Sequence, residues 1–106
     1  MSSGYCIVLT TTNDQRNRQL IIDSVLQEKL AACIQAMPIE SHYLWQGETC
    51  CDQETLLIFK TTDRCYQELA DLIAQLHDYE TPQIVKIPFS DGANPYLQWL
   101  SASTKA

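Results

Sequence analysis

Two segments of this chain are apolar on both sides, which restricts the sheet that they can form. Residues 5–12 and 54–62 are rich in β-branched, aliphatic and aromatic side chains and are typical of β-strands. Successive side chains of a strand point to opposite faces of its sheet. Ile7 and Leu9 therefore lie on one face of the first segment and Val8 on the other. A sheet that contains these strands needs an apolar cover on each side.

Two segments with helical periodicity can cover one of these faces. Residues 14–32 follow a helix cap at Asn13-Asp14, and residues 62–77 start at a second polar pair, Thr62-Asp63. Each segment repeats apolar side chains at a spacing close to 3.6 residues. The apolar positions are Ile22, Val25, Leu26, Leu30 and Cys33 in the first segment, and Tyr66, Leu69, Ala70 and Ile73 in the second.

The remaining elements follow from strand patterns and turn residues. A second strand is predicted over 33–46, and Pro38 indicates a bend, a bulge or an edge position within it. Gly47 starts a turn and a polar loop over 47–53. A fourth strand is predicted over 83–88, with a proline at each end, and a short terminal helix over 93–102.

The predicted order of elements is strand, helix, strand, strand, helix, strand, followed by the short C-terminal helix. This is the α+β, ferredoxin-like βαββαβ arrangement, with one antiparallel sheet and both main helices on one face. A chain of 106 residues fits one domain over 1–106. The second apolar face is then left without a cover. We expect a homo-oligomer to bury it, and the alternative is a different protein partner.

The charge balance argues against nucleic-acid and membrane partners. The chain has 13 Asp and Glu against seven Lys and Arg, and a formal net charge of −6. Binding of phosphate groups needs clustered basic side chains, and here these side chains are scattered. The N-terminal residues do not have the pattern of a signal peptide. No apolar stretch approaches the roughly 20 residues that span a bilayer. We therefore expect a cytoplasmic protein.

The five cysteines agree with a reducing compartment. They are odd in number, and Cys50 and Cys51 are adjacent, which is not the pattern of a secreted disulfide framework. Cys6 and Cys33 lie in apolar segments and are interpreted as small buried side chains. Adjacent thiols in a turn can bind soft metals or become oxidised, but no second cysteine pair accompanies them.

No local motif predicts an enzyme, because no nucleophile and base can be paired and no glycine-rich phosphate loop is present. Glu54 and His77 are the candidate metal ligands, since Cu(II) and Zn(II) accept carboxylate and imidazole. Their alternative interpretation is a surface carboxylate and a histidine at a helix end. Lys60 is either a solvated strand end or a cation beside Tyr79 and Glu80.

Four motifs of the chain are specific in combination: Glu28-Lys29-Leu30-Ala31-Ala32-Cys33, Tyr43-Leu44-Trp45-Gln46-Gly47-Glu48, Phe59-Lys60-Thr61-Thr62 and Tyr79-Glu80-Thr81-Pro82. Together they resemble the CutA family of divalent-cation-tolerance proteins, and the similarity extends over nearly the whole chain. The resemblance implies a tightly interlocked homotrimer, with an architecture similar to the PII signalling proteins. It also implies a cytosolic location and high thermal stability.

The resemblance also implies a copper-binding set of a thiol, a glutamate and a histidine. Thr10 occupies the position of the thiol, so this chain lacks that ligand. Glu54 occupies the position of the glutamate. The histidine falls at Leu76, and His77 is the next residue. We expect that the protein requires no cofactor. Copper or another divalent cation is the candidate metal.

Three hypotheses follow for the function. The first is a non-enzymatic trimer in divalent-cation response, whose inter-subunit clefts include Trp45, Lys60, Tyr79 and Glu80. The second is a PII-like signalling module that binds a small anionic ligand in those clefts and contacts a partner through loop 47–53. The third is a trimeric anchor that positions another protein.

Overall fold

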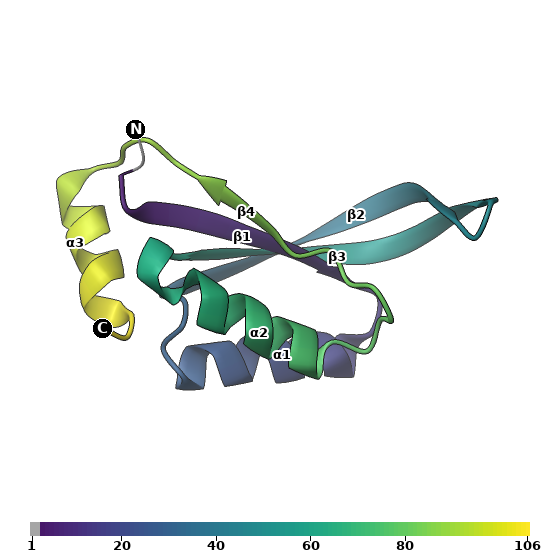
Figure 1. The fold of residues 1–106 in the computed structure, drawn as a ribbon, viewed down its shortest axis with the longest axis horizontal. Coiled ribbons are helices and arrows are strands. Elements are labelled where there is room, and N and C mark those ends of the chain that lie inside the picture. Colours follow the sequence, from purple (N-terminus) through teal and green to yellow (C-terminus); the bar gives the residue numbers. More distant parts are fainter. Residues whose placement is uncertain (1–2) are drawn as a thin grey trace.

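Four strands form one antiparallel sheet, in the spatial order β2-β3-β1-β4. The computed structural model describes residues 3–106. Figure 1 shows α1 and α2 side by side beneath one face of the sheet, and α3 at one end of it. The ferredoxin-like βαββαβ order predicted from the sequence is thereby confirmed. The elements are β1 (Tyr5–Thr12), α1 (Gln15–Gln27), β2 (Cys33–Trp45), β3 (Glu48–Thr62), a 3₁₀ turn (Asp63–Cys65), α2 (Tyr66–Leu76), β4 (Val85–Pro88) and α3 (Asn94–Ser103).

Helix α1 is shorter than its apolar pattern indicated. Its start was predicted correctly, because the Asp14 carboxylate accepts a hydrogen bond of 2.9 Å from a backbone N–H of the first turn. At the other end, Lys29 adopts a φ of 56°, and the Leu30 N–H bonds back to the Val25 carbonyl at 3.1 Å. These two features close the helix with a left-handed Schellman cap. The predicted extension of the helix to residue 32 is therefore wrong.

The core lies between the two main helices and one face of the sheet. In the register of β1 with β3, Val8 is opposite Phe59, and both are fully buried. Ile21 and Val25 are the fully buried residues of α1, whereas Leu26 is 45% exposed, so its assignment to the apolar stripe is wrong. The other large, fully buried apolar side chains of this core are Leu30, Leu57, Leu69 and Ile73.

Strands β2 and β3 form a long hairpin that projects from the body of the molecule (Figure 1). Gln46 and Gly47 both have positive φ, at 50° and 79°, as a two-residue type I′ turn requires. Pairing continues from Trp45 opposite Glu48 without interruption back to the base of the hairpin. The predicted loop over 47–53 is therefore wrong, because strand β3 already starts at residue 48. We call residues 40–53 the hairpin arm.

Pro38 lies in β2, which is an edge strand of this sheet. It is opposite Thr55, and the register is the same before and after it, so no bulge is present. The edge position predicted for Pro38 is confirmed. An edge strand tolerates proline because one side of its backbone has no ladder partner within the sheet.

The sheet face opposite α1 and α2 is also apolar, as predicted from the strand patterns. Val85 and Ile87 of β4 remain 42% and 41% exposed on this face. In the register of β1, they are opposite Leu9 and Ile7. The same face includes Leu56 and Ile58 of β3, which are opposite Thr11 and Leu9. Within residues 3–106, the two main helices leave this face uncovered. Among the described residues, no helix is long and apolar enough to cross a membrane.

Candidate functional site

A cleft of about 590 Å³ lies between the hairpin arm and the segment that follows α2. Three of the four residues predicted for a ligand cleft line it, namely Trp45, Tyr79 and Glu80. Asp52 and Glu54 of β3 also contribute to its walls. We call this the acidic cleft. A ligand role for its residues is a prediction that the geometry of one chain does not test.

The fourth predicted residue, Lys60, lies elsewhere. Its Nζ is 5.7 Å from the centroid of the Tyr96 ring, so it packs against α3 in a cation–π contact. Lys60 is paired with Cys33 at the base of the hairpin, whereas the acidic cleft adjoins the hairpin arm. Within one chain Lys60 is therefore not beside Tyr79 and Glu80, and its place in an inter-subunit cleft stays a prediction.

Tyr79 connects the two predicted metal ligands. Its hydroxyl donates a hydrogen bond to Glu54 Oε2 at 2.6 Å, and its backbone N–H donates to His77 Nδ1 at 3.1 Å. The rings of His77 and Tyr79 also pack with centroids 4.5 Å apart. Burial, together with the adjacent Glu54 carboxylate, raises the pKa of Tyr79 well above its usual range. Tyr79 is therefore a neutral donor that fixes the orientation of Glu54.

His77 has both ring nitrogens engaged. The second nitrogen, Nε2, lies 2.8 Å from the Thr11 carbonyl oxygen and donates to it, since a carbonyl can only accept. The His77 side chain is fully buried. A metal needs a nitrogen lone pair, and the one that remains on Nδ1 accepts the Tyr79 N–H. The metal role predicted for Glu54 and His77 stays a prediction, and this arrangement does not favour it.

The remaining positions of the implied copper set are not exposed. Thr10 is fully buried on the helix-covered face of β1. Leu76 packs against the core from the end of α2. Neither side chain offers a metal ligand, so only Glu54 of that set lines the acidic cleft.

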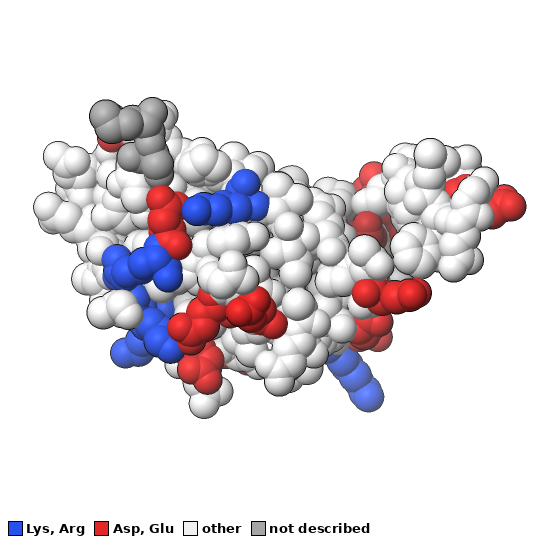
Figure 2. All heavy atoms as spheres, viewed as in Figure 1, with Lys and Arg blue, Asp and Glu red and all other residues white. Residues whose placement is uncertain are grey.

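The electrostatics of the acidic cleft favour a cation. Its lining includes three carboxylates, from Asp52, Glu54 and Glu80, and no Lys or Arg among the described residues. The Tyr43 hydroxyl donates a short hydrogen bond to Asp52, and this bond raises the pKa of Tyr43 to about 12. On the face shown in Figure 2, the hairpin arm has acidic side chains but no Lys or Arg. An anionic ligand would be repelled here.

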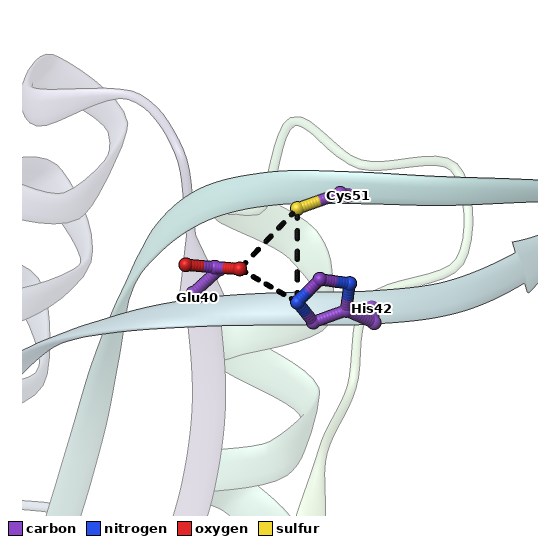
Figure 3. A group of neighbouring side chains, drawn as sticks. All are labelled: Glu40, His42 and Cys51. Atoms are coloured by element: carbon purple, nitrogen blue, oxygen red, sulfur yellow. Dashed lines mark hydrogen bonds and ion pairs between the residues drawn. The ribbon is translucent and has the colours of Figure 1, made fainter.

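A second group of polar side chains lies on the hairpin arm and was not predicted. Glu40 Oε1 is 2.7 Å from His42 Nε2, and Cys51 Sγ is 3.8 Å from each of these atoms. Figure 3 shows the three side chains pointing toward one another from β2 and β3. Desolvation and the Glu40 carboxylate raise the pKa of the Cys51 thiol. We call this group the arm triad.

A sequence signal for the arm triad exists in the turn. If Gln46-Gly47 is interpreted as a two-residue turn, Trp45 pairs with Glu48, and the count outward places His42 opposite Cys51. Glu40 is then two residues before His42 and lies on the same face. The predicted loop over 47–53 leaves Cys51 without a strand partner, so it does not place His42 beside Cys51.

The fold and the acidic cleft define the class of this chain: a ferredoxin-like α+β protein with a projecting two-stranded arm and a carboxylate-lined cleft beside the arm. The chain belongs to the family described as CutA1 divalent ion tolerance protein, whose family model matches residues 6–103. The resemblance inferred from the sequence motifs is thereby confirmed.

Individual relatives agree with this assignment. The divalent-cation tolerance protein CutA of Thermus thermophilus is 38% identical over 99 residues, which cover 92% of this chain and 96% of that protein. The chloroplastic protein CutA of Arabidopsis thaliana is 36% identical over 100 residues, which cover 93% of this chain and 55% of that longer protein. The crystal structure of CutA1 from Pyrococcus horikoshii superposes with a TM-score of 0.91 at 33% identity, covering 95% of this chain and 99% of that chain.

Proposed function

We propose that this chain acts in divalent-cation tolerance as a non-enzymatic homotrimer that binds cations, copper among them, weakly in its acidic cleft. The observation that supports the cation site is the lining of the cleft, where Asp52, Glu54 and Glu80 occur without a Lys or Arg side chain among the described residues. Carboxylates bind divalent cations, but copper prefers imidazole and thiolate ligands, so carboxylates alone hold it loosely. Membership of a divalent-cation-tolerance family agrees with this role.

Self-assembly is supported by the uncovered apolar face of the sheet. Val85 and Ile87 are about two-fifths exposed there, next to Ile7 and Leu9. At ~25 cal/mol per Å², covering ~500 Å² of this face per chain stabilises an assembly by on the order of 10 kcal/mol, before the entropy cost of association. A trimer of the PII type covers such a face with other copies of the same chain.

The cytoplasm is the compartment that we propose. All five cysteines are free, including the exposed Cys51 and its neighbour Cys50, and a reducing compartment keeps such thiols reduced. The Arabidopsis relative is named as chloroplastic, so other members of the family work in other compartments.

Cation binding is tested by calorimetric titration of copper into the wild type and into a double variant, Glu54→Gln with Glu80→Gln. We expect the cleft variant to lose the weak binding, because two of the three carboxylates are neutralised. Glu28→Gln, at an exposed position outside the cleft, is the matched control and should bind as the wild type does. Equal titration curves for the wild type and the cleft variant would exclude this site. His77→Ala tests the predicted histidine ligand in the same titration.

Self-assembly is tested by sedimentation of the wild type and of Ile87→Glu. We expect the wild type to sediment as a trimer of the 12.1 kDa chain, and Ile87→Glu to dissociate, because it places a charge on the apolar face. Leu20→Glu places the same charge at a similarly exposed position of α1, where Leu20 is 49% exposed, and should leave the assembly intact. A folded wild-type monomer would contradict the proposal.

A further inference from the structure

The arm triad has the arrangement of a metal-binding site, and it differs from the set that the family resemblance implies. Its ligand atoms are one carboxylate oxygen, one imidazole nitrogen and one thiol sulfur, from Glu40, His42 and Cys51, all within 4.8 Å of one another. All three residues are exposed, so an ion reaches them from solvent. We propose that the arm triad binds a borderline divalent transition metal, with Zn(II) as the best match.

The mixture of ligand types selects the metal. Thiolate favours soft and borderline ions, and imidazole favours Zn, Cu, Ni and Fe. Carboxylate oxygen alone favours the hard ions Mg(II) and Ca(II), which bind thiolate poorly. Zn(II) accepts sulfur, nitrogen and oxygen together in one tetrahedral site. Three protein ligands leave the fourth position for water or for a ligand from another molecule.

The dimensions of the arm triad are close to those of a tetrahedral zinc site. Zn–S bonds of about 2.3 Å and Zn–N or Zn–O bonds of about 2.0–2.2 Å place the ligand atoms about 3.4–3.6 Å apart. Cys51 Sγ lies 3.8 Å from both Glu40 Oε1 and His42 Nε2, so two edges of the triangle already fit. The third distance, 2.7 Å between Glu40 Oε1 and His42 Nε2, is shorter than this range. A side-chain rotation of Glu40, whose side chain is 55% exposed, lengthens it.

The same three residue types also occur in nucleophilic enzymes, where an acid orients a histidine that activates a cysteine. In that arrangement the acid and the thiol bind different ring nitrogens of the histidine. Here Glu40 and Cys51 both approach His42 Nε2. A proton relay cannot use one ring nitrogen for both the acid and the thiol. Three ligands of one metal ion, in contrast, bring their ligand atoms close together in this way.

The backbone holds the arm triad in register. His42 is opposite Cys51 and forms with it the fourth pair from the Gln46-Gly47 turn, in an uninterrupted antiparallel ladder. A ladder of this kind fixes the distance between opposite side chains. Cys50 precedes Cys51 along the strand and therefore points to the other face of the arm, opposite Tyr43. Cys50 thus serves as an internal control for each experiment on Cys51.

The test is a Co(II) titration of the full-length, reduced chain, followed by displacement with Zn(II). A thiolate bound to Co(II) gives a ligand-to-metal charge-transfer band, so the band reports a cysteine ligand and not occupancy of the acidic cleft. We expect the wild type and Cys50→Ser to show the band at one equivalent per chain, and Zn(II) to abolish it. Cys51→Ser should lose the band. His42→Ala should weaken Co(II) binding at least about tenfold, since even the loss of an outer-shell partner has effects of that size.

Two results would overturn the proposal: a wild type without the charge-transfer band, or a band that disappears in Cys50→Ser and persists in Cys51→Ser. Circular dichroism of each variant checks that the exposed substitutions leave the fold intact. The proposal does not rest on the proposed function. The double variant of Glu54 and Glu80 should keep the charge-transfer band, so failure of the acidic cleft and failure of the arm triad are separate outcomes.

Discussion

The Tyr79 hydroxyl donates a 2.6 Å hydrogen bond to Glu54 Oε2 and so fastens the segment after α2 to strand β3. The two residues are 25 positions apart in the sequence. Both line the acidic cleft, so this bond fixes the distance between two of its walls. A bond between a neutral donor and a carboxylate is stronger than one between two neutral groups.

Tyr79→Phe is expected to lower the free energy of unfolding by about 1–2 kcal/mol, because Glu54 loses its donor in a partly buried site. Tyr43→Phe removes a similar hydroxyl–carboxylate bond, to Asp52, from a more exposed position. It should change stability by less than about 0.5 kcal/mol. Urea denaturation of both variants measures the difference, and equal losses would contradict the special role of Tyr79.

Gly47→Ala is expected to destabilise the protein by about 1 kcal/mol, because alanine at a φ of 79° meets the steric cost of the left-handed region. A Cβ at this position contacts nothing within 4 Å, so the cost comes from the backbone alone. Gly47→Asn should cost less, since asparagine tolerates positive φ. Thermal denaturation of the two variants checks the order, and the reverse order would be inconsistent with a type I′ turn.

Thr10→Val is expected to raise the free energy of unfolding by about 1 kcal/mol. The Thr10 hydroxyl is fully buried and has no hydrogen-bond partner among the described residues, so its burial is unfavourable. Thr61→Val is the matched control on the neighbouring strand. Its buried hydroxyl donates to the Leu30 carbonyl at 2.6 Å, and its removal should destabilise by about 1 kcal/mol or more. A loss of stability in both variants would show that Thr10 has an undetected partner.

The stability of the protein is expected to fall as the pH rises from 9 towards 11. Burial and the nearby Asp63 carboxylate raise the pKa of Cys6 from 9.0 to about 11 in the folded state. The unfolded chain therefore loses the thiol proton first, and the stabilisation that is complete below pH 9 disappears through this window. Chemical denaturation across the window should show a smaller decline for Cys6→Ala than for the wild type. Equal declines would assign the effect to other groups.

Much of the fold could be predicted because its signals are local. The strand over 5–12 and the start of α1 depend on patterns within a few residues, and the structure agrees with them. The start predicted for the second helix at Thr62-Asp63 is wrong, because a 3₁₀ turn occupies Asp63–Cys65 and α2 begins at Tyr66. The end of α1 could not be predicted in this way. It depends on Lys29 adopting a left-handed conformation, which is more typical of glycine, and the apolar Leu30 beyond it resembles a continuation of the helix.

The candidate sites were predictable only in part. Trp45, Tyr79 and Glu80 do line one cleft, but Lys60 packs on Tyr96 instead. The start of β3 was missed because the hairpin arm exposes residues of both strands to solvent, so its polar side chains do not alternate with apolar ones. With that strand interpreted as a loop, Cys51 had no assigned neighbour.

The sequence alone determined the order of the elements, the two apolar faces of the sheet and membership of the family, because each depends on patterns that are read within short segments. The tertiary structure decided which side chains meet: Tyr79 with Glu54, and His42 with Cys51. The contact of Tyr79 with Glu54 depends on how the segment after α2 packs against β3. The contact of His42 with Cys51 depends on strand register, and a shift of one residue moves every side chain of a strand to the opposite face. A two-residue turn at Gln46-Gly47 sets that register here, so the arm triad depends on a conformation that no pattern of apolar residues encodes.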